Sequence, residues 1–256
     1  MRMAGLLEVC ADSVCSAVNA ARGGADRIEL CSALPLGGLS PDEDLFCMVR
    51  ERIDIPVRVL LRPRAGDFLY DEDEFELLCR QASRFAGLGA DGIVIGMLNP
   101  DGTLDAERMS ALMACGDGCG VTLHRAFDVC RDAHEALRTA KKLGVDTILT
   151  SGQQARCADG APLLRELVSE SGEGLRILIG GGVNADVIRA LASQTGADAF
   201  HLSAKAVVPS GMEFRRENVP LGIPGLNEFE LWRCDEGAVR AAREALDAVC
   251  TARKEN

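Results

Sequence analysis

The chain has 256 residues, and its 28 Lys plus Arg against 39 Asp plus Glu give a formal net charge of −11. This acidic balance leaves no basic surface for a phosphate backbone, so we expect no nucleic-acid partner. The length suits a single α/β barrel, a fold that commonly takes ~250 residues, and no charge-free apolar run approaches the ~20 residues that would span a membrane.

The first segment and the cysteines both indicate a cytoplasmic protein. Met1 to Leu7 is too short for a secretory signal. The 11 cysteines are odd in number and scattered from Cys10 to Cys250, which argues against a disulfide framework. We expect most of these thiols to be small buried hydrophobic groups.

Eight apolar runs bounded by Gly, Pro or Asp alternate with segments of helical period. The expected strands are Leu6–Cys10, Arg27–Cys31, Val57–Arg62, Gly92–Met97, Val121–Phe127, Thr147–Ser151, Arg176–Gly180 and Ala199–Ser203. The expected helices are Ser13–Arg22, Asp42–Arg52, Asp73–Leu88, Asp105–Ala114, Asp132–Leu143, Pro162–Ser169, Ala185–Gln194 and Glu236–Val249. Strict alternation predicts a parallel sheet covered by helices, and eight units predict closure into a (β/α)8 TIM barrel, one domain over residues 1–256.

A short phrase recurs at every second helix-to-strand junction. Its copies are Gly24-Ala25-Asp26, Gly89-Ala90-Asp91, Gly144-Val145-Asp146 and Gly196-Ala197-Asp198. Gly supplies the left-handed residue that ends a helix, so the copies introduce the second, fourth, sixth and eighth strands. We therefore expect the repeat to be scaffold, with the chemistry at the opposite, carboxyl ends of the strands.

Two further patterns limit the architecture. No GxGxxG motif follows the first strand, so we expect no nucleotide cofactor. From Ala206 to Phe229 the chain is rich in Pro and Gly and has no periodicity, which predicts a long irregular loop over about 206–229 before the last helix. Such a loop would be a lid, a subunit contact or a surface insertion.

The first two strands end in the same phrase, Glu8-Val9-Cys10 and Glu29-Leu30-Cys31. Because side chains alternate along a strand, each Glu shares a face with its Cys, and an ionised Glu belongs in the barrel interior rather than against the helices. Cys10 and Cys31 would then lie at the mouth on adjacent strands, about 5 Å apart at the backbone. Two neighbouring thiolates suit Cu(I); the alternatives are two inert core residues or a pair that forms a disulfide on oxidation.

Charged side chains also follow the third and fifth strands. Arg62 would pair with Glu8 or Glu29, or would clamp an anionic substrate. His124 is a candidate general acid or base, oriented by Asp128 or by a neighbouring Glu. Arg125 follows His124 directly and is a second candidate for holding an anion.

The last three strands supply further candidate anion ligands, which are Ser151, Gly180, Gly181, Gly182 and His201. The three glycines precede a helix start at Asn184, so backbone N–H groups and a helix N-terminus would face the anion, as in the phosphate-binding corner of many barrels. A tight turn that needs Gly for its geometry alone would explain the same run.

Several longer strings resemble those of the CutC family, the so-called copper homeostasis proteins. They are LEVCADS ending at Ser13, GADRIELCS from Gly24, LGGLSP from Leu36, RPRAGDFLY from Arg62, HRAFD from His124, DTILTSGQ from Asp146 and GGGV from Gly180. The resemblance runs from Leu6 to about Lys205 and implies a cytosolic TIM barrel that assembles as a homo-oligomer, a dimer or a tetramer. In members proposed to bind Cu(I), the ligands are the cysteines of the two Glu-x-Cys strings, here Cys10 and Cys31.

Two functional hypotheses follow. In the first, the protein is a cytosolic copper homeostasis protein that binds Cu(I) through thiolates at the barrel mouth. In the second, it is an enzyme of the lyase, isomerase or hydrolase type that acts on a small anionic or phosphorylated metabolite, with Glu8, Glu29 and His124 transferring protons. A copper carrier has no evident need for Arg62, Arg125 and Asp128 at the mouth, and this surplus keeps the second hypothesis open.

Overall fold

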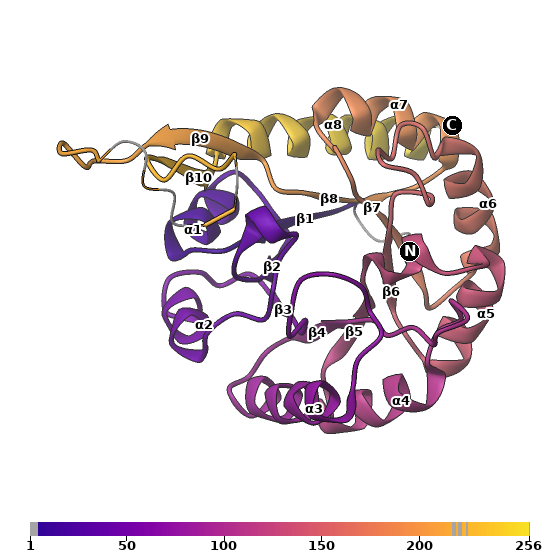
Figure 1. Ribbon diagram of the computed structural model, residues 1–256. Coiled ribbons are helices and arrows are strands. Elements are labelled where there is room, and N and C mark those ends of the chain that lie inside the picture. The colour runs from indigo at the N-terminus through magenta and orange to yellow at the C-terminus, as the bar shows by residue number, and fades with distance from the viewer. Residues whose placement is uncertain (1–4, 217–218, 220–221, 224, 256) are drawn as a thin grey trace.

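The computed structural model describes residues 5–216, 219, 222–223 and 225–255. Eight parallel strands close into a barrel in chain order, and helices cover its outer face, as the sequence predicts (Figure 1). The strands of the barrel are β1 (Leu6–Ala11), β2 (Arg27–Leu30), β3 (Val57–Leu60), β4 (Gly92–Ile95), β5 (Gly120–Leu123), β6 (Thr147–Thr150), β7 (Arg176–Ile179) and β8 (Ala199–Leu202).

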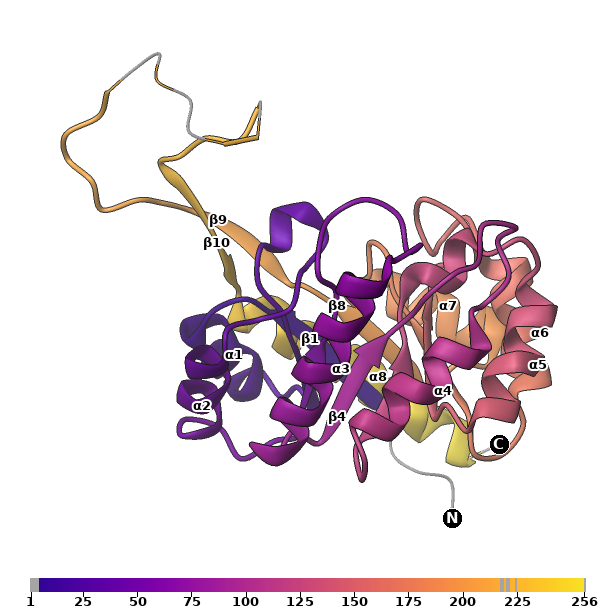
Figure 2. The same cartoon turned by 60° about the horizontal axis from the view of Figure 1, so that its bottom comes forward.

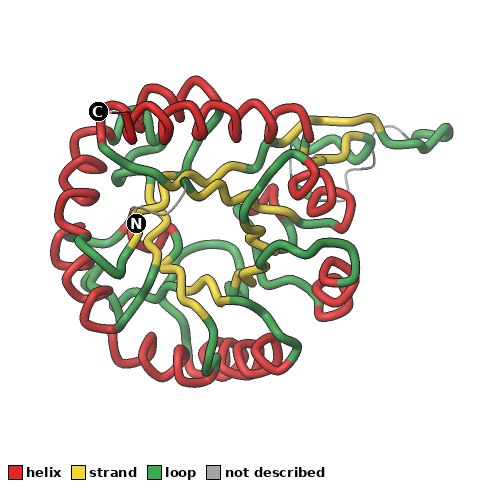
Figure 3. The backbone as a smooth tube through the Cα atoms, turned by 180° about the vertical axis from the view of Figure 1, so that it is seen from behind, coloured by secondary structure: helices red, strands yellow, loops and turns green. Residues whose placement is uncertain are grey.

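The helices follow the strands one by one around the barrel, as the view from behind shows (Figure 3). They are α1 (Val14–Arg22), α2 (Glu43–Arg50), α3 (Glu72–Gly87), α4 (Ala106–Cys115), α5 (Ala133–Leu143), α6 (Ala161–Ser171), α7 (Ala185–Thr195) and α8 (Glu236–Glu255), with short 3-10 helices η1 (Leu34–Leu36) and η2 (Arg125–Val129). In the described part of the chain, no helix combines the length and the apolar character needed to cross a membrane.

Three strands end earlier than their apolar runs predict. β3 ends at Leu60, β4 at Ile95 and β5 at Leu123, whereas the runs continue to Arg62, Met97 and Phe127. After β5 the chain turns into η2, where the His124 side chain accepts a hydrogen bond from the Ala126 backbone N–H. The residues beyond each strand are thereby freed from the ladder to form loops over the carboxyl ends of the strands, which we call the upper end of the barrel.

The recurring Gly-Ala-Asp-like phrase has a structural explanation. Its first residue has a φ of 94° at Gly24, 87° at Gly89, 81° at Gly144 and 79° at Gly196, the left-handed conformation that Gly adopts without strain. In three copies the Asp then accepts a hydrogen bond from one backbone N–H group near the start of the preceding strand. These bonds join Asp26 to Leu7 at 2.7 Å, Asp91 to Val57 at 2.8 Å, and Asp146 to Val121 at 2.7 Å. Each such Asp therefore ties an odd strand to the next even strand at the lower, amino end of the barrel.

The barrel has two apolar layers. The main core lies between the sheet and the helices and includes the alternate strand residues Leu7, Val9, Ile28 and Leu30. The opposite faces of the strands fill the interior, where Leu149, Leu178 and Ala199 form one small cluster and Cys31, Leu60 and Val94 form another. The interior is therefore a packed core with polar groups above and below it, not a channel.

The segment predicted as one long irregular loop begins as a strand, and a second strand follows it directly. β9 (Lys205–Pro209) and β10 (Glu230–Cys234) pair antiparallel, with Trp232 opposite Val207. The prediction of irregular structure is therefore wrong for residues 206–209, because a Pro- and Gly-rich segment says little about pairing between its two flanks. The resulting arm projects from the barrel near α1 (Figures 1 and 2).

Candidate functional site

A buried carboxylate joins three strands at the upper half of the barrel interior. Glu8 on β1 is fully buried, its Oε1 lies 2.8 Å from Nδ1 of His201 on β8, and its Oε2 accepts a 2.5 Å hydrogen bond from Nε of Arg27 on β2. Burial by itself raises the pKa of Glu8, but Arg27 and His201 outweigh it and lower this pKa to about 2. Glu8 is therefore a permanent anion that orients both of its partners.

Glu29 on β2 differs from Glu8 in charge state and in bonding. Burial and the neighbouring Glu8 carboxylate raise its pKa to about 7, against the lowering effect of His201 and Arg27. Its Oε2 is buried without a hydrogen-bond partner among the described residues. One ligand atom from each of Glu8, Glu29 and His201 lies within 4.8 Å of the others. Glu29 therefore exchanges a proton near neutral pH, next to a histidine held in place by Glu8.

His201 is held in its protonated form in this cluster. Burial lowers its pKa, but the neighbouring Cys10 sulfur and the Glu29 and Glu8 carboxylates together raise it well above the usual value. Cys10 is therefore the cysteine that lies beside a protonated imidazole.

The two cysteines both face the interior, as predicted, but they do not lie directly opposite each other. In the β1–β2 ladder Cys10 pairs with Glu29, and Ala11 pairs with Leu30, so Cys31 lies two residues further along. The predicted spacing of about 5 Å is wrong, and the two residues are diagonal neighbours, for which a separation of ~7–8 Å is usual. The alternation of side chains along each strand could be predicted from the sequence, whereas the stagger between neighbouring strands arises from barrel closure.

Cys31 is more deeply enclosed than Cys10. The exposed fraction of Cys31 is 1%, and its thiol donates to the Ala11 carbonyl at 3.6 Å. A Cβ built on Gly38 would lie 3.4 Å from the Cβ of Cys31. Burial, together with Cys10 and Glu29, raises the pKa of Cys31 well above its ordinary value. Deprotonating this thiol therefore requires a compensating cation.

Arg62 holds loops together and does not pair with Glu8 or Glu29, contrary to the prediction. Its guanidinium donates to the carbonyl oxygens of Leu36 at 3.1 Å, Gly38 at 3.0 Å and Gly66 at 2.9 Å. It also lies over the Phe68 ring, 5.2 Å from the centroid. The guanidinium of Arg62 is therefore bonded to backbone carbonyls of the loops after β2 and β3.

His124 has a structural partner different from the one predicted. Its Nδ1 accepts a 3.1 Å hydrogen bond from the Ala126 backbone N–H, and its ring lies 4.7 Å from that of Phe68. Burial and the nearby Arg62 guanidinium lower its pKa to about 3, so it is a neutral imidazole. The prediction that Asp128 orients His124 is wrong, because η2 carries Asp128 away toward β6.

Asp128 instead organises the loop after β6. It accepts hydrogen bonds from Thr150 Oγ1 at 2.6 Å and from the Ser151 backbone N–H at 3.0 Å, and it pairs with Arg125 at 2.7 Å. Arg125 also donates to Ser151 Oγ at 2.9 Å. The structure thus brings together three of the predicted residues, Asp128, Ser151 and Arg125, of which Arg125 is half-exposed.

The glycine run after β7 adjoins both this loop and His201. A Cβ on Gly181 would lie 3.1 Å from that of Ser151, and one on Gly180 would lie 3.6 Å from His201 Cδ2. Gly181 and Gly182 have φ values of 97° and 85°, which a larger residue would adopt only with strain. The Asn184 side chain accepts from two N–H groups at the start of α7, so this helix terminus is satisfied within the chain and the turn itself remains as the feature facing the site.

Arg27 is the functional residue that the sequence reading missed. It shares a face of β2 with Glu29 and Cys31, and this spacing of two was the available signal. It lies at the start of the strand, whereas the functional residues of this fold are expected at the carboxyl ends of the strands. Its contact with Glu8 shows that one long side chain can reach the middle of the barrel from below.

Fold and site together define a TIM-barrel protein with its acid, thiol and imidazole groups at the upper end, the usual position of the functional site in this fold. The chain belongs to the CutC family, whose model matches residues 5–206. It is 40% identical to a CutC family protein of Chromobacterium violaceum over 242 residues, which cover 94% of this chain and 98% of that protein.

Two further comparisons agree with this assignment. The chain is 43% identical over 237 residues to the human protein named copper homeostasis protein cutC homolog, with 92% of this chain and 86% of that protein covered. The solved structure of a CutC protein from Streptococcus agalactiae superposes with a TM-score of 0.73 at 26% identity and covers 78% of this chain and 98% of that one. Copper homeostasis is therefore the functional context of this family.

Proposed function

We propose that the protein binds Cu(I) at the upper end of the barrel through the thiolates of Cys10 and Cys31. The observation that carries this proposal is the interior position of Cys10 and Cys31 on the adjacent strands β1 and β2, with Cys10 beside His201. Thiolates are the soft ligands that Cu(I) prefers. The family's copper context supports the choice of metal.

The charges around the two thiols suit a monovalent cation. Glu8 is anionic and Glu29 becomes so near neutral pH, whereas Cys31 stays protonated because burial and the neighbouring negative groups raise its pKa. A bound cation would displace the Cys31 proton, so affinity should rise with pH. Since Gly38 and its loop cover Cys31, copper would enter from the side of Cys10.

A competition titration of Cu(I) against a chromophoric chelator tests this proposal under reducing, anaerobic conditions. The wild-type chain should hold one Cu(I) tightly, and the Cys10→Ser, Cys31→Ser double variant should lose that site. The Cys47→Ser, Cys250→Ser double variant removes two partly buried thiols elsewhere and should keep it. Unchanged affinity in the Cys10 and Cys31 double variant would contradict the proposal.

A second candidate function is acid–base catalysis on a small anionic or phosphorylated metabolite. The specific observation is Glu29, a buried carboxyl with a pKa of about 7 and an oxygen that lacks a partner among the described residues. A general base works best when its pKa lies near the working pH. Arg125, Ser151 and the glycine turn lie on the neighbouring side of His201, where an anionic group of the substrate would be held.

A screen of phosphorylated small molecules tests the second function. If Glu29 is the base, turnover should rise with pH through about pH 7 and should fall by ~10²–10⁴-fold in Glu29→Gln. The Cys10→Ser, Cys31→Ser double variant serves as the control that separates the two functions, since catalysis by Glu29 does not need thiolates. Turnover that Glu29→Gln leaves intact would rule out this base.

The cytoplasmic location and the homo-oligomeric state are part of the same proposal. Sedimentation equilibrium would distinguish a dimer or a tetramer from a monomer. Fractionation of cells that express the full chain would test the location.

A further inference from the structure

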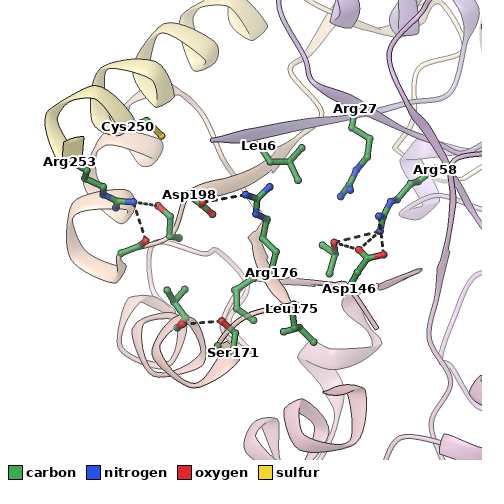
Figure 4. Close-up of a pocket in the computed structure, with 17 residues that line it drawn as sticks. Leu6, Arg27, Arg58, Asp146, Ser171, Leu175, Arg176, Asp198, Cys250 and Arg253 are labelled. Carbon is green, nitrogen blue, oxygen red and sulfur yellow. Dashed lines mark hydrogen bonds and ion pairs between the residues drawn. The ribbon is translucent and has the colours of Figure 1, made fainter. Parts of the chain in front are cut away.

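A cavity of about 560 Å³ opens at the lower end of the barrel, opposite Cys10 and Cys31. Its volume lies within the range of ~300–1,000 Å³ that is usual for small-molecule sites. Four arginines from separate elements line it, and Figure 4 shows them around the opening: Arg27, Arg58, Arg176 and Arg253. This concentration of cations is unexpected in a chain with a net charge of −11.

Two of these arginines are paired with carboxylates of the recurring phrase. Arg58 donates to both oxygens of Asp146, at 2.7 and 3.0 Å, and is thereby neutralised. Arg176 makes a single, longer contact of 3.4 Å with Asp198, and both side chains are partly exposed to the cavity. Arg176 therefore has donor capacity left for a ligand, since a guanidinium carries five N–H groups.

Arg253 contributes a charge from outside the barrel. It reaches from α8 to the carbonyl oxygens of Gly196 and Ala197, at 3.1 and 3.0 Å. These are dipolar partners and do not cancel its charge. Three carboxylates oppose the four guanidinium groups: Glu8 pairs with Arg27, Asp146 with Arg58, and Asp198 with Arg176. The cavity therefore keeps a surplus positive charge.

Arg27 carries the observation that indicates a ligand. Its side chain is 90% buried, and its Nε is bound to Glu8, but its Nη2 is buried with no partner among the described residues. A buried charged donor that lacks an acceptor is costly, so native structures rarely leave one unsatisfied. Figure 4 shows this guanidinium directed into the cavity, on the side of Leu6 that faces Arg58.

We propose that this cavity binds a small phosphate-bearing anion, with the phosphate held between Arg27 Nη2 and Arg176. Arginine forks match the geometry of phosphate oxygens and hold them bidentately. The apolar part of the lining, which includes Leu6, Val168, Leu175 and Ile177, would contact the carbon portion of a phosphate monoester. The site lies at the opposite end of the barrel from the thiols and the glycine turn, so it is independent of both functions proposed above.

Isothermal titration of the full chain with inorganic phosphate and with glycerol 3-phosphate tests the proposal, with sodium chloride at the same ionic strength as the blank. We expect one saturable site that Arg176→Gln weakens at least tenfold. Tighter binding of the ester would identify a phosphorylated metabolite as the ligand, and equal binding would identify free phosphate. Phosphate heats no larger than those of chloride would overturn the proposal.

Two matched controls locate the bound phosphate. Arg189→Gln removes an exposed arginine on α7 and should leave the affinity unchanged. Arg125→Gln removes the half-exposed arginine of the upper end, where the second candidate function would hold an anion, and so tests whether the phosphate binds there instead. Loss of binding in Arg125→Gln with retention in Arg176→Gln would assign the phosphate to the upper end and overturn the proposal. If Arg176→Gln does not fold, as judged by circular dichroism, Arg253→Gln replaces it with the same expected weakening.

Discussion

The two ends of the barrel interior treat their polar groups differently. At the lower end, three aspartates of the recurring phrase are each bonded to a strand N–H group and to an arginine. At the upper end, Glu29 Oε2, Arg62 Nε and His124 Nε2 are buried and without partners in the described chain. Satisfied polar groups stabilise a fold, whereas unsatisfied ones are retained where a ligand or a reaction uses them.

Arg27 is one of two exceptions at the lower end, since Arg27 Nη2 and Arg243 Nε are also buried without partners in the described chain. One nitrogen of the Arg27 guanidinium holds Glu8 in the cluster, and another is buried without a partner among the described residues, on a side chain that lines the lower cavity. The aspartates of the lower end therefore have a structural role only, whereas Arg27 also contacts the candidate site. The following variants test the contrast, beginning with the largest expected effect.

Replacing Arg27 by Met should cause the largest loss of stability. The variant leaves the fully buried Glu8 carboxylate without its guanidinium, and breaking a buried ion pair in this way costs about 3–5 kcal/mol. Urea unfolding followed by circular dichroism measures the free energy of unfolding. Arg27→Lys keeps the charge and should recover part of the loss, and a loss below about 1 kcal/mol in Arg27→Met would show that water reaches Glu8.

Replacing Glu29 by Gln should change how stability depends on pH. The pKa of Glu29 is about 7 in the folded chain against 4.5 ordinarily, so its contribution to stability is complete below pH 4.5 and is lost as the pH rises through 7. Relative to wild type, Glu29→Gln should therefore gain on the order of 2 kcal/mol between pH 5 and pH 8. Urea unfolding at both pH values measures this difference, with Glu51→Gln, which changes an exposed glutamate, as the matched control.

Replacing Asp146 by Asn should have a smaller effect, felt at the lower end alone. Asn keeps an oxygen that can accept from Val121 N–H but loses the charge opposite Arg58. Because this carboxylate is 38% exposed, we expect a loss of about 1 kcal/mol of unfolding free energy. The surface pair of Arg189 with Asp186 is the reference, since Arg189→Ala should cost less than about 0.5 kcal/mol. Equal losses in the two variants would remove the distinction between a scaffold pair and a surface pair.

Much of the fold could be predicted from the sequence, because the relevant signals are local. Apolar runs, helix caps and the glycines that end helices act within a few residues, so the eight strands and eight helices were found in order. Strand ends were less accurate, since the apolar residues after β3, β4 and β5 pack in loops rather than in the ladder.

The sequence predicted which residues belong to the site more accurately than it predicted the contacts between them. The structure brings together Glu8, Glu29, Cys10 and His201 as interior neighbours, consistent with their alternation along the strands. It separates His124 from Asp128 and gives Arg62 carbonyl partners instead of carboxylates. Such pairings depend on loop paths and long side chains, which leave no periodic trace in the sequence.

The sequence by itself determined the βα alternation, the family, and which strand residues face the interior. The tertiary structure decided that Cys10 lies across from Glu29, that His201 joins Glu8 to the cysteine, and that Arg27 on β2 pairs with Glu8 on β1. The physical reason is that side-chain direction repeats every two residues along each strand, whereas the stagger between strands is set by closing all eight into one barrel.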